Sequence, residues 1–487
     1  MRFFEKVNDV DDNFYENYRV LCGIEEEFFI INRKGNLVNA ADNLMVEAAD
    51  ILKNDQDLLQ SLKIKIRGLD AEPNPAQIEY VTLPLKPENL KEAVQAGREL
   101  LIKAAKAIGV KILAQSLHPI ESDPHPIVGT HINVSVQKQN NLMLPDEVMN
   151  VYNYLWNYLP EIIAVTANSP IYQGKITNIS SNRCANSNVL KDNGFAKIKT
   201  PDYQPSLVTR RYYGRMRYQL KIGSGEDEFE KKVIANSRGE RLVDITPRGP
   251  FTNLGDDKDE SPTRNRVEVR IVDTQQELDD VLDIAYLCCL SALHAVVLGM
   301  SGKILEDPFH YKNLENAIAH GRKARLLRDN NVKQPVKESI SAWIDDISIY
   351  QNYLNVHFKR IDKEPFEKSR EQAQLSIEYK TRKIEKIRQQ GKINAVVVLK
   401  KTRIIKDNNG NKYKIPSGRQ IHGRLLAEYD LSYEEEHGLI TYFNAIKVTN
   451  FLKVQGLKIR LEPEDKIVSV RTQRQSLFDR LLGGFPF

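Results

Sequence analysis

Four short segments of this chain alternate polar and aliphatic residues with the period of a β-strand, and this alternation constrains the fold most. Successive side chains of a strand point to opposite faces of a sheet, so every second residue shares a face. The segments are residues 23–29 (GIEEEFF), 77–81 (QIEYV), 129–136 (GTHINVSV) and 266–271 (RVEVRI). Each segment predicts a strand with one aliphatic face and one polar face.

The polar faces of these predicted strands offer carboxylates, amides, a histidine and arginines, but no lysine. Their members are Glu25, Glu27, Gln77, Glu79, His131, Asn133, Ser135, Arg266, Glu268 and Arg270. For one strand alone, an antiparallel sheet with a wet outer face is the ordinary explanation. Solvated strand faces usually contain lysine, so its absence from all four favours a functional site.

The residue types predict phosphoryl chemistry with a divalent cation. Glu25 and Glu27 lie about 7 Å apart on one strand face, and Mg²⁺ prefers such hard oxygen ligands while it shares phosphate oxygens with a substrate. Arginine holds phosphoryl oxygens bidentately, which lysine does less well. The sequence has no G-x-x-x-x-G-K-[ST] motif, and Gly223-Ser224-Gly225 lacks a third glycine, so neither a P-loop nor a dinucleotide fold is indicated.

Composition limits the class of protein and its location. The 487 residues allow roughly three structural units, and the near balance of 70 Lys+Arg against 65 Asp+Glu does not predict a nucleic-acid partner. The start of the chain shows no secretory signal, and the longest apolar stretch, residues 281–300, contains Asp283 and His294. We therefore expect a buried helix, no membrane partner and a cytoplasmic location.

Helical periodicity indicates where the other elements lie. Helices are predicted from Pro87 to Gly109, from Pro145 to Asn168 with a kink at Pro160, and from Gln276 to Gly299 in the interior. Residues 169–265 show little periodicity and are expected to form loops over the site. We place a domain boundary near residue 390, with a catalytic domain at 1–390 and a small mixed α/β unit at 391–487. Within that unit, Asp407–Gly410 predicts a hairpin turn, and Glu434–Glu436 is expected in a charged helical stretch.

Short motifs in a fixed order suggest a family. They are GIEEEF at 23–28, GTHINVS at 129–135, TANSPIYQG at 166–174, Ser181-Asn182-Arg183, and VEVRIVD at 267–273. With these motifs the chain resembles the glutamate–cysteine ligase superfamily, which includes the carboxylate–amine ligases, over about four fifths of its length. The resemblance implies an α+β fold, with a glutamine-synthetase-like antiparallel sheet that has a polar inner face and helices packed outside. The small C-terminal mixed unit lies outside the resemblance and is expected in addition.

The resemblance also implies roles for individual residues. The expected ligands of Mg²⁺ or Mn²⁺ are Glu25, Glu27, Glu79 and Glu268. The expected catalytic residues are Arg183 and Arg270, which would hold a substrate carboxylate or the transferred phosphate. ATP, the co-substrate, is expected beside His131, Asn133, Ser135, Arg266 and Arg322.

The function implied is an ATP-dependent ligase that forms a γ-glutamyl-type amide bond between glutamate and an amine such as cysteine, through an acyl phosphate. Its partners would be small-molecule amino acids and amines, and a homo-oligomer stays open. The alternatives are a guanidino-group phosphotransferase, an amidinotransferase, or a non-catalytic relative that binds nucleotide or amino acid. An amidinotransferase needs a nucleophilic cysteine, and Cys184 beside Arg183 has no base next to it in the sequence.

Overall fold

The computed structural model describes residues 17–33, 35–72, 74–119, 127–138, 143–172, 175–177, 179–185, 245–248, 265–301, 307–328, 332–361, 393–407, 410–455, 457–462 and 464–472. The chain divides into two compact units. Unit 1 comprises Met1–Gln372 and Glu435–Thr441, and unit 2 comprises Ala373–Glu434 and Tyr442–Phe487. The boundary expected near residue 390 falls in 362–392, outside the described residues.

Unit 1 is built on an antiparallel sheet whose strands follow the order β2-β3-β1-β5-β9-β8. Each of the four alternating segments forms a strand of this sheet. The strands are β1 (Tyr18–Ile31), β2 (Ile66–Ala71), β3 (Gln77–Thr82), β5 (Gly129–Lys138), β8 (Ile245–Arg248) and β9 (Arg266–Asp273). The α+β class and the antiparallel sheet with a polar face are therefore confirmed.

The register of this sheet aligns the polar residues of neighbouring strands. Glu27 lies opposite Glu79, Glu25 lies opposite His131, and Asn133 lies opposite Glu268. Directly opposed residues of antiparallel strands have Cβ atoms about 5 Å apart. The β5–β9 pairing shifts by one residue between Thr130 and Ile132, and such a bulge re-aims the side chains beside it.

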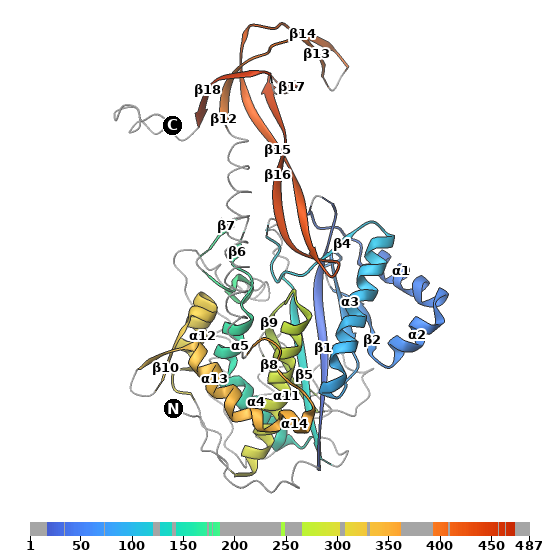
Figure 1. Cartoon of the computed structure of the whole chain (residues 1–487), viewed down its shortest axis with the longest axis vertical. Helices are drawn as coiled ribbons and strands as arrows, with labels where there is room; N and C mark the ends of the chain where they lie inside the picture. Colours follow the sequence, from blue (N-terminus) through green and yellow to red (C-terminus); the bar gives the residue numbers. More distant parts are fainter. Residues whose placement is uncertain are drawn as a thin grey trace. The chain divides into compact units, whose positions relative to one another are not determined.

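Helices of unit 1 pack against the aliphatic side of these strands (Figure 1). Helix α11 (Leu278–Ser301) packs on β1 and β5, and α3 (Leu90–Ala107) packs on β3. Among the described residues, Leu278–Gly299 of α11 has the length and apolarity of a membrane span, but an 18-residue window of it is wholly buried in the protein. The buried helix expected for residues 276–299 is confirmed.

The remaining elements of unit 1 surround this core. The expected helix at 145–168 is two helices, with Pro160 in the first turn of the second, where its fixed φ is tolerated. These elements are α1 (Ala41–Asn54), α2 (Gln56–Lys63), η2 (Pro87–Asn89), β4 (Lys111–Leu113), α4 (Pro145–Asn157), α5 (Leu159–Thr166), β6 (Ile171–Tyr172), β7 (Lys175–Ile176), α6 (Asn182–Ala185), α12 (His310–His320), η5 (Gly321–Lys323), β10 (Arg325–Leu327), β11 (Lys333–Pro335), α13 (Val336–Ile347), η7 (Ser348–Tyr350) and α14 (Gln351–Leu354).

A buried ion pair fixes β1 to α3. Glu26 points away from the polar face, as the alternation predicts, and is completely buried. Arg98 donates from Nε and Nη2 to the two carboxylate oxygens of Glu26, each at 2.8 Å, and the Tyr80 hydroxyl donates to Glu26 as well. Arg98 also donates to the carbonyls of Gln275 and Gln276, which precede α11. A buried carboxylate requires such partners, because an unpaired buried charge costs several kcal/mol, on the order of 3–5.

Unit 2 is a small β structure in its described residues. Its strands are β12 (Ile393–Val398), β13 (Arg403–Lys406), β14 (Lys412–Ile415), β15 (Gln420–Glu436), β16 (Leu439–Val454), β17 (Leu457–Arg460) and β18 (Lys466–Thr472). The turn expected at 407–410 joins β13 to β14, with Gly410 N–H bonded to the Asp407 carbonyl. The helix expected at Glu434–Glu436 is wrong, because these residues end strand β15 and lead into a turn at His437 and Gly438, both with positive φ.

The tip of the β15–β16 hairpin belongs to unit 1. Leu439 and Ile440 pair in parallel with Ile112 and Leu113 of β4, and both are almost completely buried. The Ala114 N–H donates to the Ile440 carbonyl at 3.1 Å, and Lys111 forms an ion pair with Glu435. Unit 1 therefore includes a strand from far along the sequence.

We predict that Ile440→Asp destabilises unit 1, because it buries an unpaired carboxylate. The loss should be about 3–5 kcal/mol in the free energy of unfolding. Both tryptophans of the chain, Trp156 and Trp343, are buried in unit 1, so tryptophan fluorescence during urea unfolding reports on this unit. The control is Ile404→Asp on β13, where the side chain is 69% exposed. Equal losses of stability in the two variants would contradict the assignment of the β15–β16 hairpin tip to unit 1.

Candidate active site

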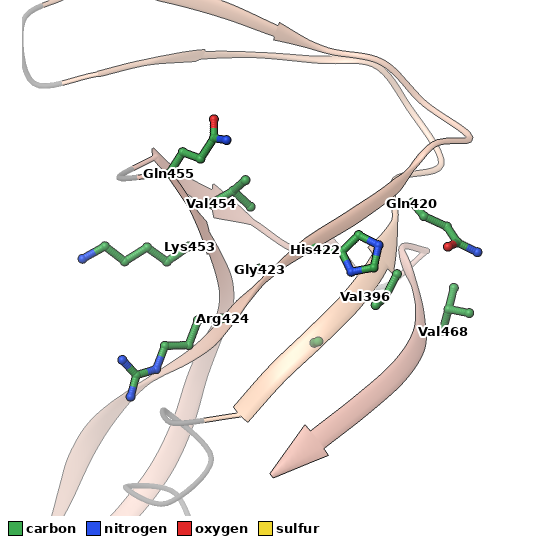
Figure 2. Close-up of a pocket in the computed structure, with 10 residues that line it drawn as sticks. Val396, Gln420, His422, Gly423, Arg424, Lys453, Val454, Gln455 and Val468 are labelled. Atoms are coloured by element: carbon green, nitrogen blue, oxygen red, sulfur yellow. The ribbon is translucent and has the colours of Figure 1, made fainter. Parts of the chain in front are cut away.

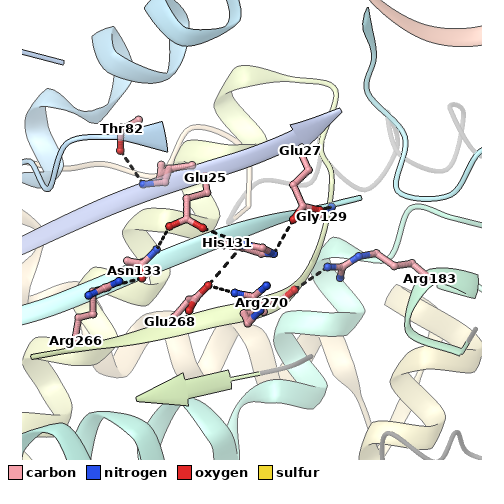
Figure 3. A network of polar contacts seen from close by, with 11 residues as sticks. Glu25, Glu27, Thr82, Gly129, His131, Asn133, Arg183, Arg266, Glu268 and Arg270 are labelled. Atoms are coloured by element: carbon pink, nitrogen blue, oxygen red, sulfur yellow. Dashed lines mark hydrogen bonds and ion pairs between the residues drawn. The ribbon is translucent and has the colours of Figure 1, made fainter. Parts of the chain in front are cut away.

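His131 lies at the centre of the polar face of the unit 1 sheet (Figure 3). Its Nδ1 is 3.1 Å from Glu25 Oε2 and 3.6 Å from Glu268 Oε1, while its Nε2 is 3.4 Å from Glu27 Oε1. The three carboxylates come from β1 and β9, and β5 runs between those strands. The sequence-predicted residues of three strands thus meet around one imidazole.

Two sets of side chains on this face could hold a cation. The first set is Glu25, His131 and Glu268. The second set, three carboxylates beside the first, is Glu27, Glu72 and Glu79. In each set the candidate ligand atoms lie within 4.8 Å of one another. Because the second set contains only hard oxygen donors, it suits Mg²⁺ or Mn²⁺.

Crowding of the carboxylates changes their proton affinity. Burial, followed by the charges of Glu25, Glu72, Glu27 and Asp70, raises the pKa of Glu79 to about 10. Burial and the charge of Glu27 also raise the pKa of Glu72. A bound cation would lower the pKa of both carboxyl groups again, because a nearby positive charge favours their ionised form.

Two arginines of β9 border the carboxylates. Arg270 pairs with Glu268, and Arg266 Nε donates to Asn133 Oδ1 at 2.9 Å. Asn133 in turn donates from Nδ2 to Glu25 Oε1 at 3.2 Å. Burial alone would lower the pKa of Arg270, but the charges of Glu268, Glu27 and Glu25 raise it above its ordinary value. Arg270 is therefore a permanent cation at the edge of the cluster.

Arg183 reaches the cluster from α6. Its Nη2 donates to the Arg270 carbonyl at 2.9 Å, and its guanidinium lies against Gly129. A Cβ at Gly129 would come within 2.1 Å of that Nη2. The Gly129 N–H also donates to Glu27 Oε2 at 2.7 Å. The glycine of the GTHINVS motif therefore leaves space for Arg183 and fixes Glu27.

Asp273, the last residue of β9, holds the loop that carries Arg183. One of its carboxylate oxygens accepts from the Asn168 N–H and the Ser169 hydroxyl, each at 2.8 Å. The other oxygen accepts from the Ser181 hydroxyl at 3.1 Å. Burial raises the pKa of Asp273, and these hydrogen bonds oppose the rise. The N-S-P and S-x-R motifs are thus bound to the strand that carries Glu268 and Arg270.

The structure adds Glu72 and Asp273 to the residues expected from the sequence. Glu72 lies just beyond the end of β2, where no strand alternation marks a face. Ser135 donates to the Asn265 carbonyl at 2.8 Å. Arg322 lies in η5, which packs against α5, and it joins none of the contacts above. Most of the expected loop, residues 169–265, lies outside the described residues.

Cys184 is not available as a nucleophile. Its side chain is buried, and burial followed by the charge of Asp273 raises the pKa of its thiol to about 12. The other three cysteines, Cys22, Cys288 and Cys289, are buried as well. A thiolate, rather than a thiol, is the reactive species, so these cysteines do not suit covalent catalysis.

The fold and the site together define an α+β protein with a carboxylate-lined sheet face. The model of the glutamate–cysteine ligase family 2 matches residues 21–329, more than half of the chain. The chain belongs to this family, whose general activity is that of ATP-dependent carboxylate–amine ligases. Every residue of the candidate site lies inside the matched range.

Two curated relatives are similar to this chain over most of their own length. A glutamate–cysteine ligase from Haloquadratum walsbyi is 25% identical over 342 residues, which cover 63% of this chain and 79% of that protein. A glutamate–cysteine ligase from Haloferax volcanii is 25% identical over 365 residues, with coverage of 69% and 86%.

Two solved structures align with lower similarity. The complex between prokaryotic ubiquitin-like protein Pup and its ligase PafA aligns at 12% identity and a TM-score of 0.40, over 70% of this chain and 60% of that one. A novel glutamine synthase homolog aligns at 13% identity and a TM-score of 0.32, over 70% and 72% of the two chains. The family assignment rests on the family match and not on these alignments.

We predict that the pH dependence of stability reveals the crowded carboxylates. Without divalent cations, folded Glu79 keeps its proton between pH 4.5 and about 10, while unfolded Glu79 has lost it. The folded state then binds more protons, so the free energy of unfolding should fall as pH rises, by at most about 1.4 kcal/mol per pH unit. Glu79→Gln should remove this contribution, and Mg²⁺ should remove it in the unsubstituted chain.

The measurement is urea unfolding across this pH range, with and without EDTA. The matched control is Glu99→Gln on α3, where the carboxylate is exposed, and its pH dependence should equal that of the unsubstituted chain. The same slope in Glu79→Gln as in Glu99→Gln would contradict the geometry of the cluster.

Proposed function

We propose that this chain is a ligase that uses ATP and Mg²⁺ or Mn²⁺ to join the side-chain carboxylate of glutamate, or a similar acid, to an amine such as cysteine. One observation carries the proposal: five carboxylates and one histidine gather with arginines on one sheet face, in a chain of this family. Small-molecule substrates and a cytoplasmic location are part of the same proposal.

The cluster has the charges that phosphoryl transfer requires. Catalysis of this step depends mainly on positioning and charge neutralisation, with little covalent help from the protein. A bound Mg²⁺ or Mn²⁺ would neutralise phosphate oxygens and align the γ-phosphoryl group with the acceptor carboxylate. Glu27, Glu72 and Glu79 would hold one cation, and Glu25, His131 and Glu268 would hold another. His131, expected from the sequence on the nucleotide and metal side, would be a cation ligand in this proposal.

The two catalytic arginines have different surroundings. Arg270 is kept cationic and oriented by Glu268, so its guanidinium would bind the substrate carboxylate and the developing acyl phosphate bidentately. Arg183 is fixed by its bond to the Arg270 carbonyl. Its Nε is buried without a hydrogen-bond partner among the described residues, and a buried donor of this kind suits a ligand oxygen. Asn133 and Arg266 would contact ATP from the opposite side of Glu268.

The alternatives differ in what they require. An amidinotransferase depends on a cysteine thiolate, and the raised pKa of buried Cys184 opposes that chemistry. A non-catalytic relative would bind ATP without turnover. Release of ADP that depends on both an acid and an amine separates the ligase from a binding protein and from an amidinotransferase, which uses no ATP.

The direct test is ADP release with glutamate and a panel of amines, cysteine first, in the presence of Mg²⁺. We expect amine-dependent ADP release and a γ-glutamyl amide as product. Glu268→Gln should lower the rate roughly 100-fold or more, because removing a cation ligand costs several kcal/mol of transition-state stabilisation. The control, Glu99→Gln, should keep full activity. Normal rates in both Glu268→Gln and Glu25→Gln would refute the cation site.

A second prediction concerns Gly129. Gly129→Ala should push the Arg183 guanidinium away from the cluster, because the new methyl group would overlap its Nη2. Activity should fall by about tenfold or more, with little loss of stability, since no charge or core group is removed. The matched control is Gly68→Ala in β2, where nothing lies within 4 Å of the added methyl group. Steady-state kinetics and thermal unfolding are measured for both variants. Equal rates in Gly129→Ala and Gly68→Ala would count against a role for Arg183.

A further inference from the structure

Unit 2 carries a groove that the ligase proposal leaves without a role. It lies outside residues 21–329, the part matched by the family, and all of its lining residues belong to unit 2. The groove has a volume of about 780 Å³ and is formed by strands β12, β15, β16 and β18 (Figure 2). This volume lies within the range of sites for small-molecule ligands, roughly 300–1,000 Å³.

The charged side chains of the groove come from strand positions that alternate with those of the core of unit 2. On β15, Ile421 and Leu425 pack against that core, while His422 and Arg424 are exposed. On β16, Leu452 is completely buried and Lys453 is exposed. Ala395 and Val454 contribute to both the groove and the core, but core packing does not require the exposed polar residues His422, Arg424 and Lys453.

The polar residues of the groove all favour an anion. Arg424 and Lys453 are cations, and His422, Gln420 and Gln455 add further donors. Neither aspartate nor glutamate occurs among the described residues that line it. Acidic residues of unit 2 pair elsewhere: Asp465 with Arg403, and Glu464 with Lys401. Across the described part of the chain, neither Arg424 nor Lys453 forms an ion pair.

The lining is also divided into two ends. Both cations, Arg424 and Lys453, lie at one end with Val454 and Gln455, while His422, Gln420, Val396 and Val468 lie at the other (Figure 2). Val468 is 45% exposed, which leaves apolar surface for a ligand to cover. A ligand that matches this division has its negative charge at one end and a less polar group at the other.

We propose that the groove binds a phosphate ester of nucleotide size, at a site separate from the carboxylate cluster. Exposed pairs between single charges contribute little binding free energy, so one carboxylate would be held weakly. A phosphate chain accepts several charge-assisted hydrogen bonds from Arg424, Lys453 and the Gln455 amide at once. Inorganic phosphate would leave most of the groove empty. Single-stranded nucleic acid is disfavoured, because its sites use aromatic side chains for base stacking and the described lining residues include no aromatic ring besides His422.

The test uses the full chain in EDTA, with ADP as the probe and hydrogen exchange measured by mass spectrometry. ADP should slow exchange in peptides that contain residues 393–398 and 420–425. The double variant Arg424→Ala/Lys453→Ala should need about tenfold more ADP for the same protection. The control Lys400→Ala/Lys414→Ala removes two exposed charges of unit 2 outside the groove and should behave like the unsubstituted chain.

Several outcomes would overturn the proposal. Equal losses in the two double variants would mean that diffuse charge, and not the groove, attracts ADP. Protection limited to peptides of unit 1, or no protection at all, would exclude the site. If inorganic triphosphate gave the same protection from exchange at the same concentration as ADP, the preference for an ester would be contradicted. If an RNA oligonucleotide gave this protection at a lower concentration than ADP, the groove would be a polynucleotide site instead. Because the readout is local exchange in unit 2, it does not depend on ligase activity.

Discussion

Repulsion between carboxylates on one partly buried sheet face is the constraint on which the rest of unit 1 depends. Two like charges 4 Å apart repel by about 4 kcal/mol at an effective dielectric constant near 20, and five glutamates share this face with one histidine. Burial, and then the same repulsion, raises the pKa of Glu79 to about 10, so that Glu79 retains a proton. Such a cluster persists only where a rigid scaffold holds it, and the cation that relieves it is the one that phosphoryl transfer would use.

The scaffold holds the cluster through contacts on its other side. The strands that carry the glutamates present aliphatic residues to α11 and α3, and the fully buried pair of Glu26 with Arg98 ties β1 to the start of α11. Asp273 does the same for the loop of Arg183 by accepting hydrogen bonds from two motifs. Each acidic residue of the GIEEEF motif thus faces a different environment: Glu26 is neutralised by protein, whereas Glu25 and Glu27 face the candidate cation sites.

Much of this arrangement could be predicted from the sequence, because strand alternation is local. The period of two assigned Glu25, Glu27, His131 and Glu268 to polar faces and Glu26 to the opposite face, without knowledge of the fold. The alternation does not specify register, so the opposition of Glu27 and Glu79 needed the structure. Glu72 lies beyond the end of its strand, and Leu439 and Ile440 join β4 from more than 300 residues away along the chain. Glu434–Glu436 was misassigned because a charged run is equally compatible with a helix and with a strand end.

The central claim is that the two sets of ligands bind divalent cations together with ATP. Anomalous diffraction from crystals grown with Mn²⁺ and a non-hydrolysable ATP analogue tests it most directly. The account predicts two manganese peaks, one coordinated by Glu27, Glu72 and Glu79 and the other by Glu25, His131 and Glu268, with the terminal phosphate between them and Arg270. Nucleotide bound away from this sheet face, or manganese absent from both sets while nucleotide is bound, would contradict it.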